Sequence, residues 1–309
     1  MPWFFRRKRT AEATSADAAD QRGLFGRRYT AGIPYMLPTD MQEVNRLDFQ
    51  HYMIRYVLKG NYVAPIGAPT SILDAGTGTG RWAVEMAAQF PRASVVGVDA
   101  VTPQADAARA ADASQDELPE QERRPANYRF VAANLLEGLP FDDGSFDFVH
   151  QRLLYSAIPA PRWPGEVREL ARVTRPGGWV ELVEGSLGST QGDVGPAMRQ
   201  LFDWAVAVTG KREIDLGIGT HLHTFLREAG LASVTQREIA LPIGTRGGRL
   251  GTMVEADLVS VTTGLRAPII AVGLTDGETF DKTLAAWRAE MQRYSYSWPI
   301  YVAYGQRPR

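Results

Sequence analysis

The chain of 309 residues contains no cysteine, which excludes disulfide bonds, thiolate metal sites and thiol nucleophiles. It has no apolar run of about 18 residues, so we expect no transmembrane helix and no integral membrane association. Lysine and arginine total 34 and aspartate and glutamate 35, which gives a formal net charge of −1. This balance argues against a nucleic-acid partner, because phosphate backbones select strongly basic surfaces. A cysteine-free chain fits the reducing cytoplasm, and we expect a cytoplasmic protein.

The sequence predicts one domain that follows a short leader. We expect a flexible N-terminal tail over residues 1–30, where small and polar residues follow a basic start. Residues 31–309 are expected to form a single domain, since no long polar linker divides them. Within this domain we expect an N-terminal cap helix in 31–60, a cofactor-binding core in 71–185, a substrate and lid region in 193–265 and a final strand in 296–306.

Strands and helices are predicted to alternate through the middle of the chain. Short apolar runs are separated by segments with helical periodicity, a pattern that predicts an α/β fold with a mostly parallel sheet and helices on both faces. The helix in 31–60 is expected to begin at a capping box formed by Thr39 and Gln42. Strands are predicted over 71–76, 93–100, 128–134, 145–152 and 179–185, and helices over 81–90, 103–115 and 164–174.

A glycine-rich turn follows the first of these strands in the sequence "DAGTGTG", residues 74–80. Open α/β sheets bind ligands at the carboxyl ends of their strands, so this turn lies where a ligand is expected. Its glycines let a ligand lie against the backbone, and the following helix N-terminus favours a polar or anionic group. Dinucleotide sites use the spacing G-x-G-x-x-G, whereas the spacing here is G-x-G-x-G. The turn alone leaves two classes of nucleotide cofactor open.

Two residues further along the chain distinguish between these two classes of cofactor. Asp99 ends the second predicted strand, where a carboxylate can accept hydrogen bonds from both hydroxyls of a ribose. Asn134 ends the third predicted strand, where an amide can read an adenine edge. With "LPFDDGSFDFVHQR" and "RPGGWVELVE", these motifs of 71–185 resemble the class I S-adenosylmethionine-dependent methyltransferases. The resemblance implies a Rossmann-like, seven-stranded, mostly parallel sheet with an antiparallel last strand, an N-terminal helical extension and a C-terminal lid insertion.

The resemblance also implies S-adenosylmethionine as the cofactor and a set of residues that bind it. Asp99 would hold the ribose hydroxyls, and Asn134 with Leu135 would hold the adenine. Arg81 departs from the aliphatic residue expected at its position, and places a cation near the cofactor carboxylate or at the mouth of the pocket. The cofactor-binding residues that the resemblance implies are Asp74, Gly76, Thr77, Gly78, Gly80, Asp99, Ala100, Asn134 and Leu135.

The segment "YMLPTDMQEVNRLDFQH", residues 35–51, resembles the pattern Y-x-L-P-x-D-x-x-E-x-x-R-L-x-x-Q-H of LaeA-like methyltransferases. This resemblance implies methyl transfer to a small molecule such as a specialised metabolite, with the acceptor atom (O, N or C) open. Because the LaeA-like group includes regulators, a regulatory protein that binds the cofactor and acts through protein partners is a second hypothesis. A nicotinamide-dependent oxidoreductase is less favoured, because none of the four lysines lies four residues after a tyrosine.

Methyl transfer is an in-line displacement, so the protein chiefly aligns donor and acceptor and accepts a proton where one must leave. His150, near the end of the fourth predicted strand, is a candidate general base, the alternative being that it orients the next loop. Tyr35 is a second candidate catalytic residue that would close over the cofactor, or else a packing anchor. Gln151 and Glu184 are candidates for substrate binding, and Glu184 equally for a salt bridge.

No metal site is expected. His221 and His223 would point apart on a helix, and no acidic third ligand is obvious near them. Arg152 is expected to brace Asp147 or another acid. A homo-oligomer is compatible with the sequence, which does not specify the oligomeric state.

Overall fold

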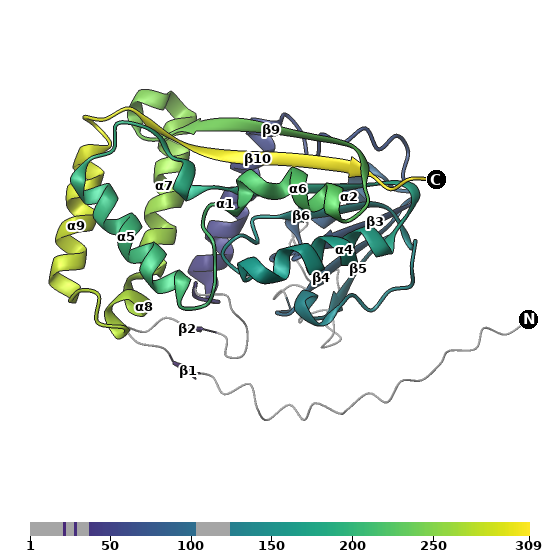
Figure 1. The fold of residues 1–309 in the computed structure, drawn as a ribbon, viewed down its shortest axis with the longest axis horizontal. Helices are drawn as coiled ribbons and strands as arrows, with labels where there is room; N and C mark the ends of the chain where they lie inside the picture. The colour runs from purple at the N-terminus through teal and green to yellow at the C-terminus, as the bar shows by residue number, and fades with distance from the viewer. Residues whose placement is uncertain (1–20, 23–27, 30–36, 103–123) are drawn as a thin grey trace, which may run out of the picture.

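The computed structural model of the protein describes residues 21–22, 28–29, 37–102 and 124–309. A central β-sheet dominates these residues (Figure 1). A separate small ladder joins β1 (Gln21–Arg22) to β2 (Arg28–Tyr29). The strands of the central sheet are β3 (Ser71–Ala75), β4 (Ser94–Asp99), β5 (Tyr128–Ala132), β6 (Phe146–Arg152), β7 (Thr174–Gly185), β8 (Gln191–Gly192), β9 (Ala232–Pro242) and β10 (Tyr296–Gln306).

The order of the long strands is β5-β4-β3-β6-β7-β10-β9, and the two-residue β8 pairs with the start of β10. The strands from β5 to β7 are parallel, whereas β10 runs antiparallel to both β7 and β9. The predicted seven-stranded, mostly parallel sheet with an antiparallel last strand is therefore confirmed. Strand order reverses at β3, with β4 on one side and β6 on the other, so ligands are expected at the carboxyl end of β3.

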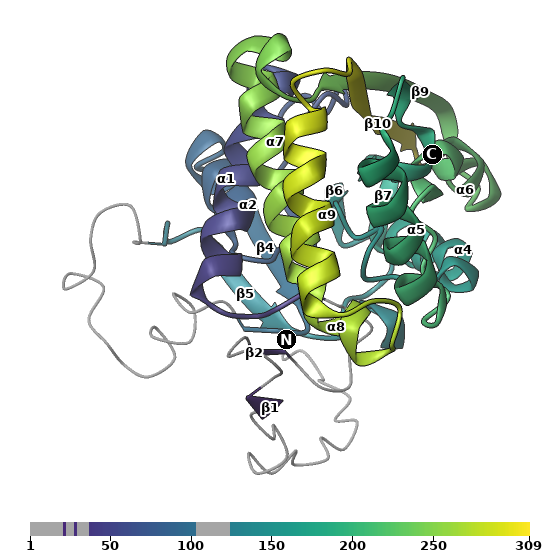
Figure 2. The ribbon, with the colours of Figure 1, turned by 90° about the vertical axis from the view of Figure 1, so that its left-hand side faces the viewer.

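Helices cover both faces of the sheet and gather at one end of it. Figures 1 and 2 show α5, α7, α8 and α9 beyond the carboxyl ends of the parallel strands, with α1 beside α7. No helix in the described part of the chain is long and apolar enough to cross a membrane. The predicted helix over 103–115 and most of the predicted tail over 1–30 lie outside the described residues. The helices are α1 (Met41–Leu58), α2 (Arg81–Gln89), α4 (Trp163–Val173), α5 (Pro196–Gly210), α6 (Leu222–Glu228), α7 (Gly248–Gly264), α8 (Arg266–Ala271) and α9 (Gly277–Glu290).

Each face of the sheet has its own hydrophobic core, because side chains alternate along every strand. In β3, Ile72 packs in one core with Trp82 and Met86 of α2, whereas Leu73 belongs to the larger core on the other face. Helices α4 and α6 pack in that larger core, which Leu170 and Leu226 help to fill. The sheet is thereby packed between two apolar layers, and its strand ends are left for the site.

Helix α1 begins at Asp40, whose Oδ1 accepts hydrogen bonds from the backbone N–H groups of Gln42 at 3.1 Å and Glu43 at 3.2 Å. The predicted capping box with Thr39 as the cap is therefore wrong, because the next residue in the chain takes the cap position. An aspartate at this position satisfies two helix N–H groups that have no partner within the helix.

A buried polar cluster ties α1 to α7. Arg46 donates hydrogen bonds to Glu43 Oε1 at 2.6 Å and to Asp257 Oδ1 at 2.9 Å, and Gln50 Nε2 donates to Asp257 Oδ2 at 2.9 Å. All four side chains are buried. Since a buried charge is tolerated when it is paired and hydrogen-bonded, this cluster fixes how α1 crosses the end of the sheet.

We predict that Asp257→Ala lowers the free energy of unfolding by about 3 kcal/mol, because it removes the α7 partner of a buried cation. Urea titration followed by circular dichroism measures this loss. The matched control is Asp281→Ala, which breaks the exposed ion pair of Arg266 with Asp281 and should cost less than about 1 kcal/mol. Equal losses in the two variants would contradict a stabilising role for the buried cluster.

Candidate functional site

The turn between β3 and α2 needs glycine for its own path. Gly76, Gly78 and Gly80 have φ values of 72°, 56° and 77°, in the left-handed region that favours glycine. A Cβ atom on Gly76 would lie 2.6 Å from Leu154 Cδ1, so the turn approaches the loop after β6 too closely for a side chain. The N–H groups of Gly76 and Thr77 both donate to the carbonyl oxygen of Val98. The turn is thereby fixed against the end of β4.

Asp74 supports this turn from within the sheet. Its buried carboxylate accepts a hydrogen bond from Thr77 Oγ1 at 2.7 Å and lies 3.0 Å from His150 Nδ1 on strand β6. The His150 ring stacks on Trp82 of α2, with ring centroids 3.9 Å apart. Burial lowers the pKa of His150, so the ring is neutral and its Nδ1–H donates to Asp74.

A cavity of about 450 Å³ lies between the turn and helix α1. This volume is within the range of small-molecule sites. Gly80 is outside the wall, beside the Tyr128 hydroxyl and the Arg124 guanidinium. The predicted cofactor residues in the wall are Asp74, Gly76, Thr77, Gly78, Asp99, Ala100, Asn134 and Leu135.

Asp99 and Asn134 lie at neighbouring strand ends in this wall. Asp99 accepts hydrogen bonds from the N–H groups of Gly78 at 2.9 Å and Val101 at 3.0 Å, while burial raises the pKa of its carboxyl. Asn134 Oδ1 accepts a hydrogen bond from Leu136 N–H at 3.1 Å and so caps the short turn that follows β5. Both side chains are therefore held in place by the backbone around them.

Arg81 joins the glycine turn to helix α1. Its Nη2 lies 2.9 Å from Asp48 Oδ2, and Thr79 Oγ1 donates to Asp48 Oδ1 at 2.6 Å. All three residues line the cavity. The cation that was unexpected at this position is thus neutralised by an acid of α1, and it fastens this helix to the turn.

Three of the four predicted catalytic and substrate residues lie beneath the cavity and outside its wall. His150, Gln151 and Glu184 are fully buried, and none of them lines the cavity. Glu184 accepts hydrogen bonds from the N–H groups of Leu154 at 3.1 Å and Tyr155 at 2.9 Å, so it supports the loop after β6. The fourth residue, Tyr35, lies outside the described residues. The roles assigned to these four residues remain predictions.

Arg152 and His51 line the cavity, although the sequence analysis did not select them. Arg152 Nη2 lies 3.0 Å from His51 Nδ1, and His51 Nε2 lies 3.3 Å from Glu85 Oε1. The prediction that Arg152 braces Asp147 or another acid is wrong within the described residues. Asp147 pairs with Arg175 near the opposite end of β6, and no described carboxylate lies within 4.0 Å of Arg152. The position of Arg152 as the last residue of a parallel strand was the signal that could have found it.

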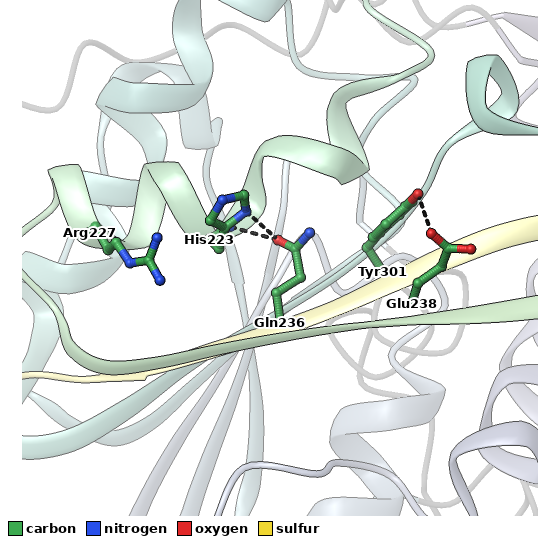
Figure 3. A pocket seen from close by; sticks show the side chains of 5 residues that line it. All are labelled: His223, Arg227, Gln236, Glu238 and Tyr301. Carbon is green, nitrogen blue, oxygen red and sulfur yellow. Dashed lines mark hydrogen bonds between the residues drawn. The ribbon is translucent and has the colours of Figure 1, made fainter.

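A second hollow lies between α6 and the strands β9 and β10 (Figure 3). Its polar side chains bind one another: His223 Nδ1 lies 3.1 Å from Gln236 Oε1, and the Tyr301 hydroxyl donates to Glu238 at 2.8 Å. Arg227 completes the lining. None of these residues belongs to the glycine turn or the strand ends beside it, so the cavity under α1 is the stronger candidate. Across the described residues, no three His, Asp or Glu side chains are arranged to hold a metal ion.

Comparison with known proteins agrees with this arrangement. A family model described as a methyltransferase domain matches residues 72–178. The methyltransferase str3 of Strobilurus tenacellus is 34% identical, over 69% of this chain and 72% of that protein. The methyltransferase pytC of Aspergillus terreus is 30% identical, over 76% of this chain and 70% of that protein. The N-methyltransferase tcpN of Claviceps purpurea is 28% identical, over 86% of this chain and 94% of that protein.

A solved structure of an O-methyltransferase family protein from Burkholderia thailandensis superimposes with a TM-score of 0.50 and 16% identity. The match covers 86% of this chain and 59% of that chain, so this chain spans less than two thirds of the solved protein. At this identity the likeness shows the fold alone.

Glu184 predicts a pH dependence of stability. Burial raises the pKa of this carboxyl from 4.5 to about 8, so the folded protein keeps a proton that the unfolded chain releases. The resulting stabilisation is complete below pH 4.5 and is lost as the pH rises toward 8. Between these limits, Glu184→Gln should lose less free energy of unfolding than the wild type in urea titrations. Exposed Glu228→Gln is the control and should follow the wild type, whereas parallel curves for E184Q and the wild type would contradict the prediction.

Proposed function

Because the chain belongs to the class I S-adenosylmethionine-dependent methyltransferases, we propose that it transfers a methyl group to a small-molecule acceptor, a specialised metabolite. The cofactor of the family is S-adenosylmethionine. The observation that carries the proposal is the cavity between the glycine turn and α1, whose wall contains eight of the nine residues that the resemblance assigns to the cofactor: Asp74, Gly76, Thr77, Gly78, Asp99, Ala100, Asn134 and Leu135.

The residues of this wall fit the cofactor. A Cβ atom on Gly78 would meet only Leu47 Cδ1, at 3.8 Å, so the bare backbone faces the open space between the turn and α1. Asp99 uses one lone pair of each oxygen for a backbone N–H group and keeps others for the ribose hydroxyls. Asn134 and Leu135 stand at the next strand end, where they would hold the adenine.

The bound cofactor supplies an electrophilic methyl group on a sulfonium, so the chain chiefly aligns the acceptor and excludes water. Asp74 and Thr77 hold the turn at the donor side. Helix α1 closes the opposite wall, where Asp48 fixes it to the turn. The alignment of methyl donor and acceptor in this site therefore depends on the contact between α1 and the turn.

Each candidate base in the described part of the cavity wall already contacts another residue. This supports a nitrogen acceptor, because an amine needs no protein base to attack a methyl group. The ring nitrogens of His51 face Arg152 and Glu85. An amine attacks through its own lone pair: the nitrogen–carbon bond forms as the sulfur–carbon bond breaks, and the proton leaves afterwards to water. The names of two relatives, the N-methyltransferases tcpN and sirN, agree with this choice. The acids of the wall are engaged in the contacts Asp40–Glu43, Glu43–Arg46, Asp48–Arg81, Asp74–His150 and Asp99–Gly78.

The acceptor side of the cavity is apolar, which indicates an acceptor with an apolar body. Met41, Val44 and Leu47 of α1 face the cavity, as do Leu154 and Ile158 of the segment after β6. Burying an apolar acceptor against these side chains favours binding by about 25 cal/mol for each Å² removed from water.

We predict that isothermal titration shows binding of S-adenosylhomocysteine by the wild type, and that Asp99→Ala weakens it about 30-fold. The loss follows from removing the carboxylate that would hold the ribose hydroxyls. Asp142→Ala, in an exposed turn, is the control and should bind like the wild type. Unchanged affinity in D99A would remove Asp99 from the site, and no heat with the wild type would overturn the proposed function.

Methyl transfer itself separates the proposed enzyme from a regulatory protein with the same fold. We expect incubation with methyl-tritiated S-adenosylmethionine and a metabolite extract of the host to label a small molecule. Mass spectrometry of the labelled product should show one added methyl group, and nuclear magnetic resonance should place it on nitrogen. A protein that binds the cofactor tightly and labels no metabolite would favour the regulatory hypothesis.

A further inference from the structure

Arg152 is a half-buried cation in the cavity wall. It ends β6, where its neighbour Gln151 pairs with Ala75, the residue that precedes Gly76. The guanidinium is therefore held beside the glycine turn. Several acids act on it through space, yet no carboxylate among the described residues approaches it within 4.0 Å. These acids are Asp74, Glu85, Glu181 and Glu184.

The single hydrogen bond of Arg152 within the described residues goes to a neutral group. His51 Nδ1 accepts it at 3.0 Å, so the proton of this ring is on Nε2, which faces Glu85. Burial lowers the pKa of His51, in keeping with a neutral ring. His51 therefore orients the guanidinium, which has no carboxylate of the described residues in contact with it.

A guanidinium has five N–H donors in a planar fork, and it matches a carboxylate through two parallel hydrogen bonds. Arg81 on the other side of the turn shows the contrast, because Asp48 already provides its carboxylate at 2.9 Å. A half-buried cation with no carboxylate in contact is costly, so Arg152 favours the binding of an anion in the cavity. Asp74 also lines the cavity and acts on Arg152 through space.

We propose that Arg152 binds the carboxylate of the methionine part of the cofactor as a bidentate pair. The inference rests on the proposed function, since it is the cofactor that brings an amino-acid group to this end of the cavity. A zwitterion matches the part of the wall where Arg152 and the carboxylate of Asp74 act on each other beside the glycine turn. The acceptor molecule is the other source of a carboxylate, and the choice of ligands below separates the two.

The test compares three ligands by isothermal titration against the wild type and Arg152→Gln. S-adenosylhomocysteine carries the carboxylate, 5′-deoxy-5′-(3-aminopropylthio)adenosine is the same molecule without it, and 5′-methylthioadenosine lacks the whole amino-acid part. We expect R152Q to bind S-adenosylhomocysteine about 30-fold more weakly and the other two with less than about 3-fold change. Retained binding of these two shows that the folded site is intact.

Arg81→Gln is the matched control, because it removes a cation that Asp48 already neutralises. It should change the affinities for S-adenosylhomocysteine and its decarboxylated analogue by the same factor. Arg152→Lys, which keeps the charge without the fork, should fall between the wild type and R152Q. An equal loss for all three ligands in R152Q, or an unchanged affinity for S-adenosylhomocysteine, would overturn the inference. Failure of the wild type to bind S-adenosylhomocysteine would instead overturn the proposed function.

Discussion

A single buried carboxylate at the end of β3 holds the site together. Asp74 accepts hydrogen bonds from Thr77 in the glycine turn and from His150 on β6, so the turn and the neighbouring strand share one anchor. Removing a carboxylate from water is costly, and two donors offset that cost. His150 is held in turn by the ring of Trp82, which carries the same constraint into α2 and the core beneath it. Asp74 therefore fixes the positions of the glycine turn and of β6 where they border the cavity.

Buried acids at other strand positions likewise accept hydrogen bonds from the backbone N–H groups of neighbouring loops. These N–H groups have no partner in a strand ladder, and a buried carboxylate satisfies them. Acids that could be mistaken for reactive groups thus belong to the framework, and the chemistry is left to alignment. The contacts are Asp147 with Thr70 at 2.5 Å, Glu181 with Ala64 at 2.6 Å and Glu184 with Tyr155 at 2.9 Å.

The fold could be predicted because its signals are local: apolar runs, glycine turns and helical periods each depend on neighbours in the chain. Asp99 and Asn134 were predictable for a related reason, since a residue that ends a parallel strand has a known place at the sheet edge. The contact of Arg152 with His51 has no local signal. It depends on where α1 crosses the sheet, and that crossing is set by Arg46 and Asp257, 211 positions apart in the chain. Glu184 shows a second limit of local signals, because its place at a strand end does not reveal that it also accepts hydrogen bonds from the loop after β6.

Helix α1 determines the charge that the cavity presents. Asp48 and His51 are three residues apart and so lie on the same face of the helix. Asp48 neutralises Arg81, whereas His51 binds Arg152 without compensating its charge. One helix thereby sets one side of the glycine turn neutral and the other positive. A shift of α1 by one turn would separate Asp48 from Arg81 and His51 from Arg152, so the cluster around Asp257 that fixes the helix also maintains both contacts.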